Sequence, residues 1–215
     1  MNRKKIKKEA REMIKGNIWE ILKPFLIVAL ITAVVGAVIT PSGMNFTGDE
    51  IEMGSFTSSF TLTILLNFAV YPLTFGCIVY VLKFVRKEPY DLKMIFEQYK
   101  KFWPIFCMYF LITLFTGLWS LLFVIPGIIA EIAYTMAPYL MADGEEDAMA
   151  TIRKSKAMMK GYKWDYFKFQ LSFFWWYLLC GITLGLAYIY VFPYLTVAQT
   201  MYYEELKKVN PPVSE

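Results

Sequence analysis

Residues 121–176 read LLFVIPGIIAEIAYTMAPYLMADGEEDAMATIRKSKAMMKGYKWDYFKFQLSFFWW, and this stretch decides the fold. It contains a Pro-Gly turn, an apolar segment, an acidic-to-basic amphipathic segment and a second apolar segment that opens on aromatic residues. Apolar segments of sufficient length cross a bilayer as helices, whereas amphipathic helices lie along its surface. The stretch therefore predicts a chain that turns at one face of a membrane, crosses it, lies along the other face and enters the membrane again.

The composition of the whole chain agrees with this reading. Of the 215 residues, 57% are hydrophobic and 19% are charged, and the mean hydropathy is +0.43. Ordinary soluble domains have roughly 45–50% apolar and about 25% charged residues. Aromatic residues reach 18%, which suits a protein with rings at two membrane interfaces. The composition excludes an ordinary soluble domain and predicts an all-α, polytopic membrane protein.

Six apolar segments are predicted to cross the membrane, since about 20 apolar residues span its hydrocarbon core. The predicted spans are residues 25–40, 58–85, 102–124, 128–142, 167–183 and 186–203. They pair into three helical hairpins within a single membrane domain, residues 1–215. Its predicted parts are an interfacial helix at 1–19, hairpin 1 at 21–85, an interfacial helix with hairpin 2 at 91–142, an interfacial helix with hairpin 3 at 144–203, and a tail at 204–215.

The interfacial helices are amphipathic and are predicted on the cytoplasmic side. In residues 1–19, Ile6, Ala10 and Ile14 recur at helical spacing among many Lys and Arg residues. Two roles stay open for this helix: it binds an anionic inner leaflet, or it is a solvated charged tail that only fixes topology. The last amphipathic segment begins acidic and ends basic, which complements the helix dipole, and Asp143 is its expected N-cap.

The orientation follows from the positions of the basic residues. All 22 Lys and Arg residues fall in four segments, which are residues 3–23, 83–101, 153–168 and 207–208. Basic residues mark cytoplasmic loops, and these segments alternate with loops that carry none. The pattern predicts a multi-pass plasma-membrane protein with both termini in the cytoplasm.

An internal repeat is also predicted. Residues 13–23 (MIKGNIWEILK) and 158–168 (MMKGYKWDYFK) share Met, Lys, Gly, Trp and the final Lys, and each has an acid after the Trp. Residues 99–103 (YKKFW) form a looser third copy. Each copy ends an interfacial helix and begins a span, with Trp at the level of the headgroups. The alternative is convergence, because every cytoplasmic entry to a membrane favours such residues.

A small set of polar residues inside the apolar segments is the candidate site. Glu131 is the only acid in an apolar run, and an ionisable group inside a membrane is a candidate for function. Proton or ion coupling is one interpretation of Glu131, and an acid near the outer interface is the other. The polar residues Asn67, Ser172 and Gln199 either line a cavity with it or form hydrogen bonds between helices.

Two further sets of residues carry hypotheses. A cytoplasmic cluster either contacts anionic lipid or only determines topology, and it consists of Lys154, Lys156, Lys160, Lys163 and Lys168. Prolines within spans break the backbone ladder and predict helix kinks, at Pro72, Pro138 and Pro193. Broken helices build the central sites of many transporters, although proline is also common in membrane helices in general.

Several classes of chemistry lack their residues in this chain. It has no His, which excludes a His-containing catalytic triad, and its three Cys residues are widely separated within apolar runs. Neither a GxxxxGK[ST] loop nor a GxGxxG loop is present. We therefore expect a protein that is not an enzyme, that has no cofactor or metal site, and that binds no nucleic acid.

The chain resembles a known family at several motifs, which are IPGII at 125–129, APYLMAD at 137–143, LSFFWW at 171–176, Pro193-Tyr194 and Tyr202-Tyr203-Glu204. These residues closely resemble the bacterial integral-membrane family catalogued as domain of unknown function nine-seven-five. The resemblance covers nearly the whole chain and implies a multi-pass plasma-membrane protein with no accepted reaction. More distantly, the chain looks like the membrane domains attached to some glycerophosphodiester phosphodiesterases, which suggests a lipid-related setting by analogy.

Two functional hypotheses stand side by side. In the first, the protein moves or shelters a lipid, a peptide or another amphiphilic solute without catalysis, which kinked spans and internal polar residues favour. In the second, it is a scaffold or accessory subunit of an envelope complex, because almost none of the chain lies outside the membrane. The expected partners are a bilayer with an anionic inner leaflet, and a membrane-protein partner or a second copy of the chain.

Overall fold

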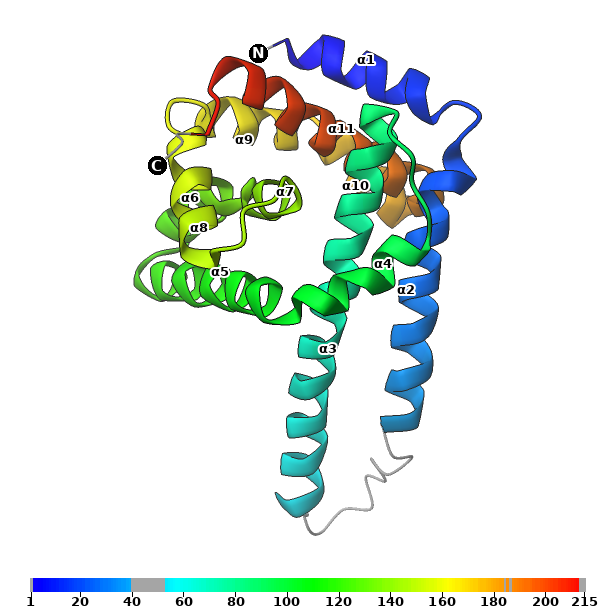
Figure 1. Ribbon diagram of the computed structural model, residues 1–215, viewed down its shortest axis with the longest axis vertical. Helices are drawn as coiled ribbons and strands as arrows, with labels where there is room; N and C mark the ends of the chain where they lie inside the picture. Colours follow the sequence, from blue (N-terminus) through cyan, green and yellow to red (C-terminus); the bar gives the residue numbers. More distant parts are fainter. Residues whose placement is uncertain (1, 40–52, 184, 186, 213–215) are drawn as a thin grey trace.

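A computed structural model of the chain describes residues 2–39, 53–183, 185 and 187–212 (Figure 1). The expected external loop, residues 41–57, lies largely outside these described residues. The described part is helical and contains no β-strand. Its elements, in chain order, are α1 (Arg3–Ile14), α2 (Ile18–Ile39), α3 (Met53–Arg86), α4 (Lys93–Glu97), η1 (Gln98–Lys101), α5 (Phe102–Leu122), α6 (Val124–Tyr134), α7 (Ala137–Ala142), α8 (Ala148–Met158), α9 (Lys163–Leu171), α10 (Phe174–Ile182) and α11 (Tyr188–Val209).

Three helical segments in the described residues are long and apolar enough to cross a membrane. They are Phe68–Arg86, Lys93–Leu122 and Val124–Ala142. A fourth is possible if α1 and the apolar part of α2, which meet at 85°, count as one bent span. This confirms an all-helical protein with helices that suit a bilayer. The finer prediction of six spans in three hairpins stays a prediction. The axis of α5 lies crosswise to α3, against which α5 packs, rather than along it (Figure 1).

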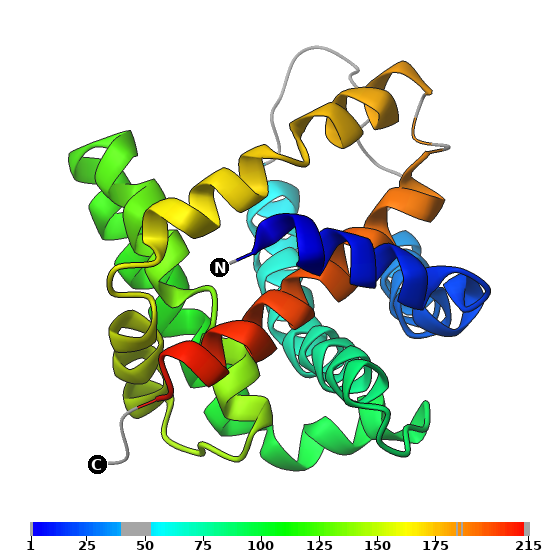
Figure 2. The same cartoon turned by 90° about the horizontal axis from the view of Figure 1, so that it is seen from above.

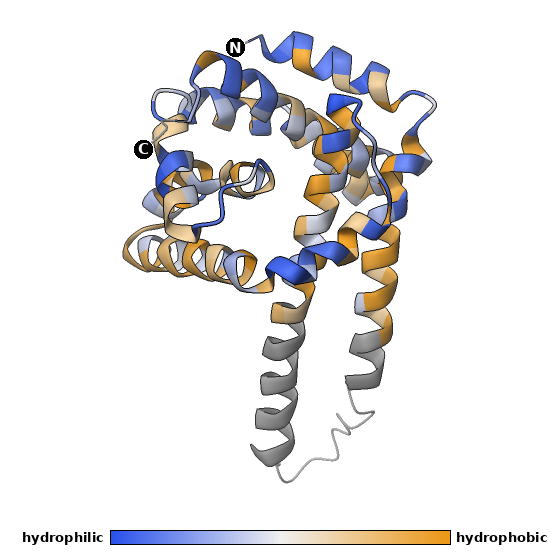
Figure 3. Ribbon diagram, viewed as in Figure 1, coloured by the Kyte–Doolittle hydropathy of each residue, from blue (hydrophilic) through white to orange (hydrophobic). Residues whose placement is uncertain are grey.

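The helix α1 lies over α11, and the two are side by side when the molecule is seen from above (Figure 2). The predicted apolar stripe of α1 holds it there, because Ile6, Ala10 and Ile14 are all buried. They belong to one core cluster with residues of α11, including Tyr194 and Leu206. The opposite side of α1 is hydrophilic, whereas the described part of α2 is mostly apolar (Figure 3). The amphipathic prediction for this segment is therefore confirmed as a packing pattern.

A second core cluster lies between α3, α5, α6, α7 and α8. It includes Ile105 of α5, Ala133 of α6 and Ile152 of α8. The buried Ser155 Oγ of α8 donates a 2.8 Å hydrogen bond to the Ala133 carbonyl, so even the polar residue on this face of α8 has a partner. Apolar burial and a satisfied hydroxyl together fix α8 against α6.

Two helix boundaries differ from the prediction. The last amphipathic helix begins at Ala148, because the carboxylate of Asp147 accepts hydrogen bonds from the next backbone N–H groups and acts as the N-cap. The expectation that Asp143 caps it was wrong. The predicted continuous span at 167–183 is divided between α9 and α10, and the side chain of Phe173 at the break is fully buried.

The three prolines behave differently from one another. Pro72 and Pro193 lie inside α3 and α11, and both helices continue through them. Pro138 lies in the first turn of α7, just after α6 ends at Tyr134. Proline is favoured in a first helical turn because the missing N–H would have no helical partner there. The predicted interruption is thus present as a helix break at Pro138.

The two segments with matching sequences have similar local geometry. Gly16 and Gly161 both have positive φ, at 92° and 84°. Each is followed three residues later by a largely exposed tryptophan, 67% exposed for Trp19 and 64% for Trp164, and Trp103 in the looser copy is 69% exposed. Exposed tryptophan beside apolar helices is typical of a membrane interface. The internal repeat itself stays a prediction.

Candidate functional site

The predicted polar set does not gather at one place in the described structure. Glu131 is exposed on α6, Gln199 is half-buried on α11, and Ser172 lies between α9 and α10. No hydrogen bond or ion pair joins these three in the described part of the chain. The backbone of Asn67 belongs to α3, but its side chain lies outside the described residues. Of the set, Ser172 lines a pocket, and that pocket is at the basic N-terminal helix.

The predicted lysine cluster is spread over α8 and α9. Lys154 forms an ion pair with Glu145, and only 20% of its side chain is exposed. Lys156 and Lys160 are exposed, and Lys163 is half-buried. The Lys168 ammonium lies 5.3 Å from the centre of the Trp164 ring, a cation–π contact beside an exposed aromatic residue. Lys154 therefore has a protein partner, and Lys168 with Trp164 suits a membrane surface better than the rest of the cluster.

A cluster of charges, which we call the ionic cluster, was missed by the sequence reasoning. Arg86 at the end of α3 contacts Asp143 at 2.7 Å through Nη1 and Glu204 of α11 at 2.7 Å through Nη2. Asp143 also accepts hydrogen bonds from Lys207 at 2.5 Å and from the Tyr203 hydroxyl at 2.6 Å. These five residues tie together the end of α3, the segment after α7 and the last turns of α11.

The side chains at the centre of the ionic cluster are largely buried. Only 14% of the Asp143 side chain is exposed, and 23% of each of Arg86 and Glu204. Burial by itself raises the pKa of the Asp143 carboxyl, but hydrogen bonds from Arg86, Lys207 and Tyr203 outweigh it and hold the pKa below its usual value. In the sequence, Asp143 ends the APYLMAD motif and Glu204 follows Tyr202-Tyr203. Their shared partner, Arg86, lies far from both along the chain, so the sequence does not indicate the contact.

The depressed pKa of Asp143 predicts a loss of stability in acid. A folded-state pKa below the unfolded one adds stability that is present above the ordinary carboxyl value and is lost as pH falls through the folded-state value. We expect the melting temperature of the parent protein to fall more than that of Asp143→Asn between about pH 5 and pH 3. Thermal melts of both purified proteins over this range measure it. Parallel losses would show that other groups dominate acid unfolding.

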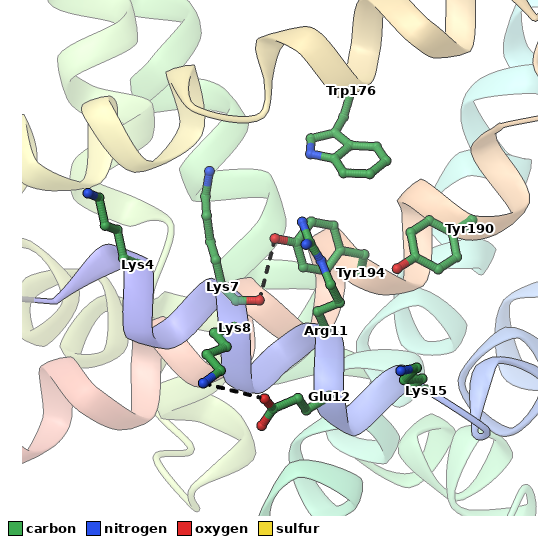
Figure 4. Close-up of a pocket in the computed structure, with 9 residues that line it drawn as sticks. All are labelled: Lys4, Lys7, Lys8, Arg11, Glu12, Lys15, Trp176, Tyr190 and Tyr194. Atoms are coloured by element: carbon green, nitrogen blue, oxygen red, sulfur yellow. Dashed lines mark hydrogen bonds and ion pairs between the residues drawn. The ribbon is translucent and has the colours of Figure 1, made fainter.

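Two open, basic pockets lie at α1. We call the one drawn in Figure 4, which has a volume of about 530 Å³, the α1 pocket. Five cationic side chains, four from α1 and one from Lys15 directly after it, line one side of it with the carboxylate of Glu12, and three aromatic rings line the other. The cations are Lys4, Lys7, Lys8, Arg11 and Lys15, and the rings are Trp176, Tyr190 and Tyr194. The neighbouring pocket, of 650 Å³, is lined by Asn2, Arg3, Lys4, Lys7 and Ser172.

Helix packing positions the two sides of the α1 pocket. The buried stripe of α1 faces α11, and Lys7 and Arg11 project on the side of the aromatic rings, whereas Lys8 bends toward Glu12 (Figure 4). Tyr194 is buried and directs its hydroxyl to the Lys7 carbonyl at 3.5 Å, while Trp176 and Tyr190 are half-buried. Such a pocket can hold an anion beside an apolar group. Sequence reasoning found the basic helix but not the rings, because α10 and α11 lie far from it along the chain.

Among the described residues, no group of three or more His, Cys, Asp and Glu side chains is placed to hold a metal ion. The three cysteines are free thiols, Cys77 buried and Cys107 and Cys180 half-buried.

A family model described as "Protein of unknown function (DUF975)" matches residues 1–130 and residues 121–210. The two matches together cover nearly the whole chain. No curated protein and no solved structure shows a significant match.

Proposed function

Because the chain belongs to the DUF975 family of proteins of unknown function, we propose its role from its own residues: it binds an amphiphilic solute at the cytoplasmic face of the bacterial plasma membrane and moves or shelters it without catalysis. The solute is a lipid, a peptide or a similar molecule with a charged end and an apolar end. The single observation that carries this proposal is the α1 pocket, which places cations and aromatic rings together at the edge of apolar helices.

The surroundings of the α1 pocket suit both ends of such a solute. Its ring side continues into α10, in which no described residue is buried. Trp175 and Ile182 of this helix are each 73% exposed, and Phe174 is 55% exposed. Apolar groups in water are costly, whereas in a bilayer the same groups meet lipid chains. A solute whose charge lies among the cations of α1 can therefore extend its apolar part along α10 into the membrane.

The proposal includes six spans with both termini in the cytoplasm. It is supported by the alternation of basic and uncharged loops, by the helices that are long and apolar enough to cross, and by the similar geometry around Gly16 and Gly161. Reporter fusions test it. Alkaline phosphatase joined after residue 47, 126 or 184 should be active, and a fluorescent protein joined to the C-terminus should fluoresce. An active phosphatase at the C-terminus would overturn the orientation.

The second candidate function is a scaffold or accessory subunit of an envelope complex. The exposed side chains of α10 and of the end of α5 favour it, because they would fit an apolar helix of a partner as well as lipid. Among them, Leu121 is 87% exposed and Phe123 is 73% exposed. Under this reading the α1 pocket only anchors the protein to the inner leaflet.

Native mass spectrometry of the full-length protein, extracted gently from its own membrane, separates the two functions. A retained lipid or peptide of defined mass is the result that we expect. A stoichiometric second protein without such a solute would favour the scaffold. A bare chain under conditions in which control membrane proteins keep their lipids would contradict solute binding.

A further inference from the structure

We infer that the α1 pocket is a binding site for the phosphate of an anionic lipid headgroup, with Lys7 and Arg11 as its principal contacts. This inference rests on the proposed function and deepens it, because it names the chemistry of the solute and the residues that recognise it.

Four of the cations on α1 or directly after it have no carboxylate partner among the residues that the structure describes. Ion pairs account for the others, Lys5 with Glu9 at 3.8 Å, Lys8 with Glu12 at 3.9 Å and Arg3 with Asp165 at 3.4 Å. The four that remain are Lys4, Lys7, Arg11 and Lys15, all of which line the α1 pocket. The spacing of Lys4, Lys7 and Arg11 places these three along one face of α1, and Lys15 follows directly after the helix. The unpaired charge of α1 is thus concentrated where the pocket opens.

The fold holds these like charges together at a cost. The Lys7 ammonium donates a 3.1 Å hydrogen bond to the Ser172 carbonyl and lies 4.2 Å from the centre of the buried Phe173 ring. The Arg11 guanidinium lies 5.8 Å from the Tyr194 ring. Partial burial, followed by the charges of Arg11 and Arg3, lowers the pKa of Lys7. A bound anion would remove this repulsion, because it is attracted to all of the cations at once.

The charge and geometry favour a phosphate group. Lysine and arginine are the residues that bind phosphate oxygens, lysine as a point charge and arginine through its planar fork of donors. The rings of Trp176 and Tyr190 on the far side of the pocket select for more than the ion alone. Indole and phenol rings favour the headgroup level of a bilayer, where one side is apolar and the other is wet. A phosphate that is joined to acyl chains satisfies both sides of the pocket, and free phosphate satisfies only one.

The test compares two double variants that each remove two positive charges from the full-length protein. Lys7→Gln with Arg11→Gln removes unpaired cations of the pocket, whereas the control, Lys5→Gln with Lys23→Gln, removes cations that have the partners Glu9 and Glu20. Affinity for short-chain phosphatidylglycerol and phosphatidylcholine is measured in detergent on protein that elutes as a single species with parental helicity. All the exchanged side chains lie at the surface or are half-buried, so both variants should fold.

We expect the pocket variant to bind phosphatidylglycerol about ten-fold more weakly than the parent, because it loses one or two charge-assisted hydrogen bonds. The affinity of the control variant should stay within about two-fold of the parent's. Phosphatidylcholine should bind the parent more weakly, and millimolar inorganic phosphate should not displace phosphatidylglycerol. Equal losses in the two variants would overturn the site, because they would report only total charge. Displacement by inorganic phosphate would overturn the lipid as its source.

The outcomes also separate this inference from the proposed function. If native mass spectrometry finds an amphiphile but the pocket variant binds phosphatidylglycerol as the parent does, the pocket assignment fails and solute binding stands. If the pocket variant alone loses phosphatidylglycerol and the protein carries only a second protein from its membrane, the headgroup site stands. In that case the site is an anchor, and the transport or shelter role fails.

Discussion

Replacing Arg86 with Met is expected to lower the free energy of unfolding by about 3 kcal/mol, the size of effect seen when one partner of a largely buried ion pair is removed. The guanidinium is the only group that joins Asp143 to Glu204 in the described structure. Without it, Asp143 keeps Lys207 as a cationic partner, and the mostly buried Glu204 loses the ion pair that it forms in the described structure. Thermal melts of purified protein in detergent measure the change, and we expect a fall of several degrees in melting temperature.

The matched control lies on the same last turns of α11. Lys208 pairs with Glu205 at 3.0 Å, but 69% of its side chain is exposed, so Lys208→Met should leave the melting temperature nearly unchanged. Similar melts for Arg86→Met and the parent would mean that water reaches the ionic cluster. Cell-level abundance should follow the melts, because a loss of a few kcal/mol is a large part of the stability of most domains.

The contrast between α1 and the ionic cluster shows what the sequence can and cannot predict. The buried stripe of α1 follows from local spacing, since residues three and four apart share a helix face. Arg86 and Glu204 are 118 residues apart, and their contact depends on how α3 and α11 pack. In the sequence, a basic residue after a span, such as Arg86, is explained equally well as a signal that fixes membrane topology. Which carboxylate it meets is decided by tertiary structure.

The division of the predicted fifth span has a similar cause. Residues 167–183 are apolar enough to read as one helix, and hydropathy does not show which aromatic residue turns inward. Phe173 packs against Phe169 and Tyr194, with ring centres 5.1 Å and 5.4 Å apart, and the helix breaks beside it. The same break places Trp176 over α1. The rings of the α1 pocket therefore come from a feature that periodicity alone cannot indicate.

Replacing Gly76 with Ala is expected to destabilise the protein by about 1–3 kcal/mol, although alanine is the better helix former. Gly76 is buried in α3 where α4 crosses it. A Cβ atom there would lie 2.6 Å from the Cα and 2.8 Å from the carbonyl oxygen of Ile95. These are backbone atoms of a buried residue, so no side-chain rotation can relieve the clash, and α4 has to move away from α3.

The same exchange at Gly117 of α5 is the control, because a Cβ atom there meets nothing within 4 Å. Gly117→Ala should stabilise the protein by up to about 1 kcal/mol through the reduced entropy of the unfolded chain. Opposite shifts in melting temperature for the two variants are the expected result, and shifts of the same sign would contradict the close contact of α3 with α4.

Since the Tyr90 ring after α3 packs on Tyr80 at 5.0 Å, a displaced α4 would also disturb the segment that follows Arg86. Gly76→Ala should therefore weaken the ionic cluster, and combining it with Arg86→Met should cost less than the sum of the two single losses.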